Sequence, residues 1–75
     1  MEELVRYIAK SLVSEPDEVN VTTVEGDNHI ILELRVAPDD MGKVIGKQGR
    51  IARAIRTVVK AASLKEHKRY VVDII

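Results

Sequence analysis

Hydrophobic residues follow a helical spacing at the start of the chain and alternate with polar residues over two later stretches. The spacing of apolar residues predicts an amphipathic helix over residues 2–14. Pro16 ends this helix because a proline biases the preceding residue away from the helical region. Alternation predicts strands over residues 19–23 and 30–36, joined by a turn at residues 26–28. These two strands should form a hairpin.

The second half of the chain is predicted to hold two more helices and a final strand. Residues 38–40, Pro-Asp-Asp, are a helix-start signal for a helix of about two turns that ends at Ile45-Gly46. A longer helix should run from Arg50 to about Ser63, followed by a polar connection over residues 65–68. Alternation then predicts a strand over residues 70–74. The expected order is therefore α-β-β-α-α-β, without repeats or linkers.

The long helix should bury one face and expose another. At about 100° per residue, one broad apolar face is expected to contact the core: Ile51, Ala52, Ile55, Val58, Val59 and Ala62. The cations Arg53, Arg56 and Lys60 should gather on the opposite side.

Small residues form a strip between those two faces of the helix. Ala54, Thr57 and Ala61 recur at spacings of three and four, which would allow a second helix to approach closely. The strip is a possible dimer contact. The more common reason for such residues is that good helix formers occupy half-exposed positions.

The two last predicted helices are separated by a loop that reads Gly-Lys-Gln-Gly over residues 46–49. Glycine permits a positive φ and lets backbone come close to a ligand. A helix that begins after such a loop directs its free N–H groups and positive dipole end toward it, where phosphate commonly binds. The loop therefore predicts a polyanion site. In the alternative interpretation, one glycine ends a helix and the other only loosens a turn.

Composition favours a small globular protein. The chain has 75 residues, of which 45% are hydrophobic and 32% charged, and this is atypical of a disordered chain. The lack of cysteine excludes a disulfide framework and a thiolate metal site. Charged residues interrupt the first ten positions, and no apolar run approaches the ~18 residues of a membrane span. We expect a soluble cytoplasmic protein with no membrane contact.

The net charge of zero hides a strong asymmetry along the chain. Residues 1–42 contain three basic and ten acidic residues, whereas residues 43–69 contain nine basic residues and one acidic residue. The basic half begins at the glycine loop. Asymmetry of this kind indicates a polyanionic partner. A solvated helix face is the alternative explanation.

Catalysis is not expected from this sequence. The only histidines, His29 and His67, are far apart in sequence and lack a metal-ligand spacing. Asp39 and Asp40 are better explained as acidic residues at the start of a helix than as a pair of catalytic carboxylates. The loop also lacks the full nucleotide-binding Gly-x-x-x-x-Gly-Lys-Ser/Thr motif. No catalytic residue, cofactor or metal ligand is therefore predicted.

Residues 42–51, Gly-Lys-Val-Ile-Gly-Lys-Gln-Gly-Arg-Ile, resemble the KH motif, in which Val-Ile-Gly-Lys-x-Gly precedes a helix with spaced isoleucines. The element order is similar to that of the type II, bacterial form. Residues 38–40 and 50–56 resemble the small stand-alone bacterial KH family called KhpA. The resemblance covers the whole chain and implies one α+β KH domain over residues 1–75. Its expected fold is a three-stranded mixed sheet with three helices on one face.

The resemblance also implies single-stranded RNA as the ligand, clamped by the glycine loop. The implied RNA-binding residues are Lys43, Val44, Ile45, Gly46, Lys47, Gln48, Gly49, Arg50, Ile51 and Arg53. The motif also places four aliphatic residues near the RNA groove or beneath it, and we expect some of these four to be purely core: Val44, Ile45, Ile51 and Ile55. Bases should be read by the second strand, with Arg35 as a contributor.

The KhpA resemblance further implies partners and a cellular role. The expected partner is a second KH protein, KhpB-like, or a second copy of the chain in a homodimer. The implied role is that of an RNA chaperone or post-transcriptional regulator linked to cell-envelope growth and cell shape. The alternative is a protein-interaction or dimerisation module in which the glycine loop is only structural.

Overall fold

A computed structural model describes all residues from 1 to 75, and its element order confirms the predicted α-β-β-α-α-β arrangement. The helices and strands are α1 (Glu2–Leu12), β1 (Asn20–Glu25), β2 (Ile30–Arg35), α2 (Met41–Ile45), α3 (Arg50–Glu66) and β3 (Tyr70–Ile74). Three short 3-10 turns lie between them: η1 (Pro16–Glu18), η2 (Pro38–Asp40) and η3 (Lys47–Gly49). None of the helices combines the length and the apolar character needed to cross a membrane.

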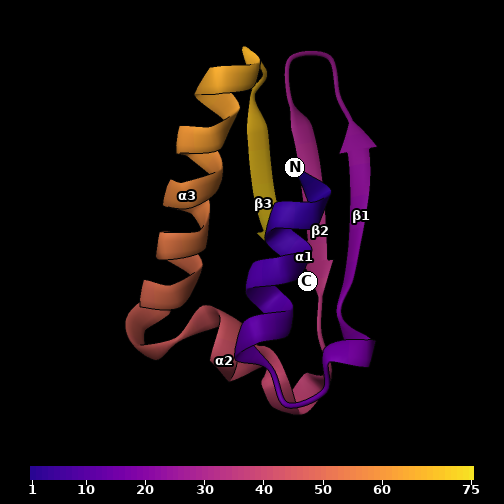
Figure 1. Cartoon of the computed structure of the whole chain (residues 1–75), viewed down its shortest axis with the longest axis vertical. Coiled ribbons are helices and arrows are strands. Elements are labelled where there is room, and N and C mark those ends of the chain that lie inside the picture. Colours follow the sequence, from indigo (N-terminus) through magenta and orange to yellow (C-terminus); the bar gives the residue numbers. More distant parts are fainter.

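The three strands form one mixed sheet with β2 in the centre. β1 pairs with β2 antiparallel, and β2 pairs with β3 parallel. A parallel pair needs a long crossover connection, and α2 and α3 provide it. Helices α1 and α3 lie over the same face of the sheet, while α2 lies at the end where α3 begins (Figure 1). The expected α+β fold, a mixed sheet with its helices on one face, is confirmed.

The core lies between this sheet face and the helices. Leu32 and Leu34 are fully buried on β2, as the alternation of the strand predicts. They pack in one cluster with the buried faces of the neighbouring elements: Val5, Ala9, Val19, Val21, Val44, Ile55, Val59 and Val72. Alternation places the intervening residues of the strands on the opposite face, which carries no helix.

The helix α3 differs from its prediction in length and in its buried face. It continues through residues 65 and 66, which were expected in a polar connection, and ends where His67 adopts a left-handed φ of 56°. The backbone N–H of Lys68 then donates to the carbonyl of Ser63. Val58 was expected in the core but its exposure is 46%, because the buried stripe follows a narrower spacing along residues 52, 55, 59 and 63.

A buried carboxylate connects the first half of the chain to α2. The side chain of Asp40 accepts the backbone N–H of Ser14 at 3.2 Å and that of Glu15 at 3.0 Å. It also pairs with the ammonium of Lys43 at 3.1 Å. Burial raises the pKa of Asp40, but these donors together outweigh burial and hold its pKa below the ordinary value. Asp40 is therefore a structural anchor, although its sequence position suggested only a helix-start acid.

We predict that Asp40→Asn lowers the Tm by more than about 5 °C at neutral pH, since the amide cannot replace a charged acceptor of three donors. The pKa of Asp40 is lower in the folded protein than in the unfolded chain, where it is 3.8, so the ionised carboxylate stabilises the fold at pH values above 3.8. This stabilisation is lost as the pH falls through the pKa of the folded state. The difference between the two proteins should therefore shrink in acid. Thermal unfolding followed by circular dichroism at neutral pH and below pH 3.8 measures this.

The exposed neighbour provides the control for this experiment. Asp39→Asn changes the same charge at an exposed position. It should leave the Tm nearly unchanged. Equal Tm values for the two variants at neutral pH would contradict the anchoring role of Asp40.

Candidate nucleic-acid interface

The loop between α2 and α3 has an unusual backbone. Gly46, Gln48 and Gly49 have φ values of 76°, 58° and 73°, so no continuous helix passes through the loop. A Cβ at Gly46 would lie 2.3 Å from Cγ1 of Ile51 and 2.9 Å from its backbone nitrogen, so only glycine fits there. No atom lies within 4 Å of a Cβ built on Gly49. Gly46 is required by packing, whereas Gly49 leaves open space beside the backbone.

The start of α3 is open to an anion. Gly49 is its N-cap residue, no side chain caps its N–H groups, and its first turn contains no acidic residue. Lys47 and Gln48 are exposed. The guanidinium of Arg50 donates to the side-chain oxygen of Gln48 at 3.1 Å, which keeps this cation beside the loop. Free N–H groups and a positive dipole end together favour phosphate.

The predicted aliphatic residues are divided between the core and the surface. Val44 is fully buried and Ile55 is 3% exposed, so both lie beneath the interface and cannot touch a ligand. Ile51 is partly buried against the core. Ile45 is 38% exposed. An apolar surface next to the loop is therefore formed by Ile45 with part of Ile51.

The cations predicted to bind RNA also fall into two groups, one paired within the fold and the other without an acidic partner. Lys43 pairs with Asp40 and donates to the hydroxyl of Ser14, so its charge is already used within the fold. The three ion pairs of the structure all lie within residues 1–43. Lys47, Arg50 and the exposed Arg53 therefore have no acidic partner. Their charge is available to a polyanion.

The strand that was expected to read bases is not the one beside α3. β2 is paired on both sides, so its backbone has no free edge, and Arg35 lies on the exposed sheet face. β3 is an edge strand next to α3 (Figure 1). Backbone hydrogen bonds join Arg69 and Ile75 to β2. The alternate residues 70, 72 and 74 therefore direct their backbone N–H and C=O groups away from β2, toward the free edge. The backbone of the second strand is therefore not free to read bases as expected, and the free edge beside α3 belongs to β3, which the sequence alone did not place.

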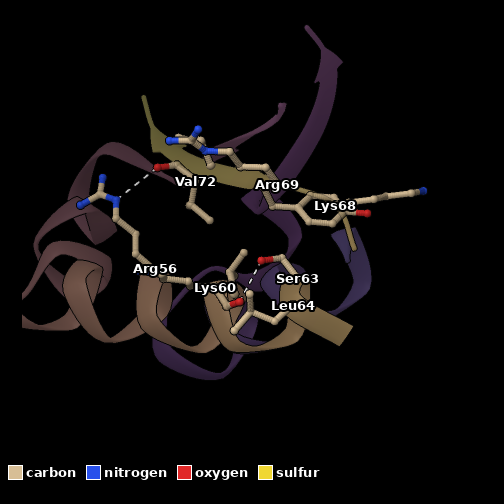
Figure 2. Close-up of a pocket in the computed structure, with 10 residues that line it drawn as sticks. Arg56, Lys60, Ser63, Leu64, Lys68, Arg69 and Val72 are labelled. Carbon is tan, nitrogen blue, oxygen red and sulfur yellow. Dashed lines mark hydrogen bonds between the residues drawn. The ribbon is translucent and has the colours of Figure 1, made fainter. Parts of the chain in front are cut away.

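Arg56 connects α3 to this free edge. Its side-chain Nε donates to the carbonyl of Val72 at 3.2 Å (Figure 2). The bond fixes the guanidinium between the helix and the strand. Sequence analysis placed Arg56 on a basic face but did not include it among the binding residues, since nothing local shows which strand it meets.

The structure brings both histidines to the far end of the sheet. His29 and His67 line one hollow beside the β1–β2 turn, although they are far apart in sequence. No group of three or more potential ligand side chains is arranged to hold a metal ion. This hollow and the glycine loop lie at opposite ends of α3, since His67 directly follows the helix.

We predict graded effects of alanine at three glycines of this region. Gly46→Ala should destabilise the fold by about 2–5 kcal/mol because it adds a clash to an unfavourable φ. Gly49→Ala should cost only the φ strain, about 1–2 kcal/mol. Gly42→Ala, inside α2 with open space around it, should be neutral or stabilising by up to about 1 kcal/mol. Urea unfolding measures all three, and equal effects at Gly46 and Gly49 would contradict the packing argument.

Two solved structures share this fold. A crystal structure of Aquifex aeolicus Era bound to GDP and AlF4− matches 96% of this chain and 28% of that chain, with a TM-score of 0.65 and 24% identity. A structure of Era with MgGDPNP and nucleotides 1506–1542 of 16S ribosomal RNA matches with a TM-score of 0.60. It covers the same shares of both chains, also at 24% identity. At this identity the likeness is one of fold.

Curated relatives match along the full chain. The relative from Clostridium acetobutylicum is 69% identical over 75 residues, and that from Clostridium perfringens is 68% identical, each with complete coverage of both chains. The relative from Treponema pallidum is 54% identical over 99% of this chain and 92% of its own length. All three are named RNA-binding protein KhpA, which is not the name of an enzyme. The family model described as KhpA/KhpB, KH domain, matches residues 2–74, and the chain belongs to this family.

Proposed function

We propose that this protein binds single-stranded RNA through the loop of residues 46–49 and the adjoining side of α3. The observation that carries this proposal is the open, uncapped start of α3, set beside two positive-φ glycines and cations without acidic partners. The relatives named as RNA-binding proteins support it. The Era structure that contains ribosomal RNA supports it at the level of the fold.

Binding proceeds through contacts of two kinds. Phosphates meet the backbone N–H groups at the start of α3 and the charges of Lys47 and Arg50. Base faces rest on the exposed part of Ile45, and base edges meet the outward backbone groups of β3. Such a clamp holds about four nucleotides. No aromatic residue lies in the loop or its flanking segments, so stacking at about 1–3 kcal/mol per base is missing there, and affinity should be weak and salt-dependent.

The double variant Lys47→Asp with Gln48→Asp should weaken RNA binding at least about tenfold, since carboxylates replace a cation and an amide beside the phosphates. Fluorescence anisotropy with a labelled oligouridylate of about eight nucleotides, twice the length of one clamp, measures the Kd. The slope of log Kd against log salt should also become shallower. The fold should persist, because both side chains are exposed.

A charge-matched control separates a local effect from a change in net charge. Lys10→Asp with Ser11→Asp makes the same charge change at two exposed positions of α1. This control should retain most of the binding. Unchanged RNA binding in the loop variant would favour the alternative, in which the loop is structural and the protein is an interaction module.

We further propose that the protein acts as a pair of KH domains, with a second copy or with a KhpB-like protein, as a cytoplasmic RNA chaperone linked to cell-envelope growth. Two weak sites joined in one particle bind one RNA at high effective concentration. The strip of Ala54, Thr57 and Ala61 is exposed on α3. The hydroxyl of Thr57 already donates to the carbonyl of Arg53 at 2.9 Å, so packing another helix against it leaves no unpaired donor.

Ala61→Arg should disrupt such a pair without changing thermal stability, because the position is exposed. Sedimentation velocity over a concentration series should show a dimer for the natural chain and a monomer for the variant. A natural chain that stays monomeric at high concentration would remove the homodimer from this proposal. RNA binding by the loop would be unaffected by that outcome.

A further inference from the structure

The outer edge of β1 is an unpaired sheet edge that no helix covers. β1 pairs only with β2, and it is the outermost strand on the side away from α3 (Figure 1). The N–H of Gly26 donates to the carbonyl of His29, and every second residue of an antiparallel pair bonds across it, so residues 20, 22 and 24 bond to β2. The backbone N–H and C=O groups of Val21, Thr23 and Glu25 therefore point away from the sheet and have no strand partner.

This edge lacks the features that usually protect an edge strand from pairing. Such strands are commonly very short, or they carry lysine, proline or a bulge. β1 has six residues, reads Asn-Val-Thr-Thr-Val-Glu, and keeps an unbroken register with β2. Its valines and threonines are β-branched, which favours an extended backbone. The other edge of the sheet has α3 beside it, with Arg56 bound to the carbonyl of Val72, so the edge of β1 is the one open to a further strand.

A row of aliphatic side chains on the helix-free face of the sheet ends at this edge. The register places Val24 beside Ile31 of β2, and Ile31 beside Val71 of β3. Val24 and Val71 are each 42% exposed, and Ile31 is partly buried. A strand added next to β1 would continue this row, and aliphatic or β-branched residues on that face would cover Val24.

The surroundings of the edge are acidic at both ends. Asp17 and Glu18 lie in η1 just before β1, whereas Glu25 ends the strand and Asp27 follows it in the turn. All four side chains are exposed, and none of them belongs to any of the three ion pairs. The unpaired backbone groups of the edge therefore lie between carboxylates whose charge is free.

Charge decides which kind of strand suits this edge. Two copies of β1 paired with each other would bring the four carboxylates of each copy to one seam, and like charges that face each other are destabilising. A strand with cations on the helix side would instead meet Glu25 and Glu2, which line one hollow together with Thr23. The complementary strand is therefore basic on one face and aliphatic on the other.

We propose that the outer edge of β1 binds an extended basic segment of a partner protein, which pairs as a fourth strand with the backbone of Val21, Thr23 and Glu25. Main-chain hydrogen bonds supply affinity in such an addition, and alternate side chains supply specificity. Cations of the segment face Glu25 and Glu2, and its β-branched residues lie beside Val24. The site is at the opposite edge of the sheet from β3, so it goes beyond RNA binding and does not depend on it.

The probe is the acetylated and amidated peptide Lys-Val-Lys-Thr-Lys-Val-Lys, added to the natural chain without RNA. At a peptide concentration about ten times the Kd, the amide protons of Val21, Thr23 and Glu25 should exchange about tenfold more slowly in NMR, because only about a tenth of the molecules then have a free edge. The same peptide N-methylated at every residue keeps its charge but has no N–H donor, and it should bind at least about tenfold more weakly. No binding, unchanged exchange at these amides, or equal affinity for both peptides would overturn the inference.

Thr23→Pro removes one outward N–H of the edge and should weaken binding of the peptide at least about tenfold. Proline is tolerated in an edge strand where its N–H would face outward, so the fold should persist, which circular dichroism checks. Thr23→Val is the matched control, since it loses the same hydroxyl but keeps the N–H, and its Kd should stay within about twofold of the natural value. Equal affinities of the two variants would contradict pairing through the backbone.

Charge reversal tests the chemistry of the partner. Glu25→Lys with Asp27→Lys should weaken binding of the peptide about tenfold, because cations then face cations. Asp39→Lys with Asp73→Lys makes the same charge change at exposed positions in η2 and on β3, away from the edge, and should retain most of the binding. Equal losses in both variants would indicate a general field of charge and overturn the inference. Slower exchange of the edge amides with rising protein concentration alone would assign the edge to a second copy, which also overturns it.

Discussion

The absence of a side chain at Gly46 is the constraint on which the arrangement of the functional surface depends. The backbone of Gly46 lies against Ile51, and a Cβ would lie 2.3 Å from the Ile51 side chain. This close contact lets α2 end and α3 begin within a few residues, while Val44 and Ile55 on either side remain buried. The same turn leaves the first N–H groups of α3 without a side-chain cap, so the packing that joins the helices also leaves these groups available to an anion.

Charge is separated in space as it is along the chain. The acidic first half uses some of its carboxylates within the fold, as Asp40 does with two backbone N–H groups and Lys43. Apart from Lys43, no cation of the basic second half forms an ion pair, and these cations extend from the loop along α3. A protein with a net charge of zero can therefore present a surface of one sign to RNA, and its affinity should depend on salt.

Parallel pairing of β3 with β2 explains why a groove forms between α3 and β3. The pairing leaves the outer edge of β3 without a strand partner, and α3 runs beside this edge. Arg56 donates to one carbonyl of this edge, and the cations that line the groove are Arg56 and Lys60 on α3 with Lys68 and Arg69 in the connection before β3.

The sequence by itself determined the order of the elements and the glycine loop, because these depend on local periodicity, on glycine conformation and on residues adjacent in the chain. Its resemblance to the KH motif implied the fold. The sequence also predicted which half of the protein carries the positive charge. Only the tertiary structure decided that β3 rather than β2 has the free edge, that Lys43 is held by Asp40, and that Val44 lies below the surface. Those outcomes depend on contacts between residues distant in sequence, such as Arg56 with Val72, and local patterns carry no information about such contacts.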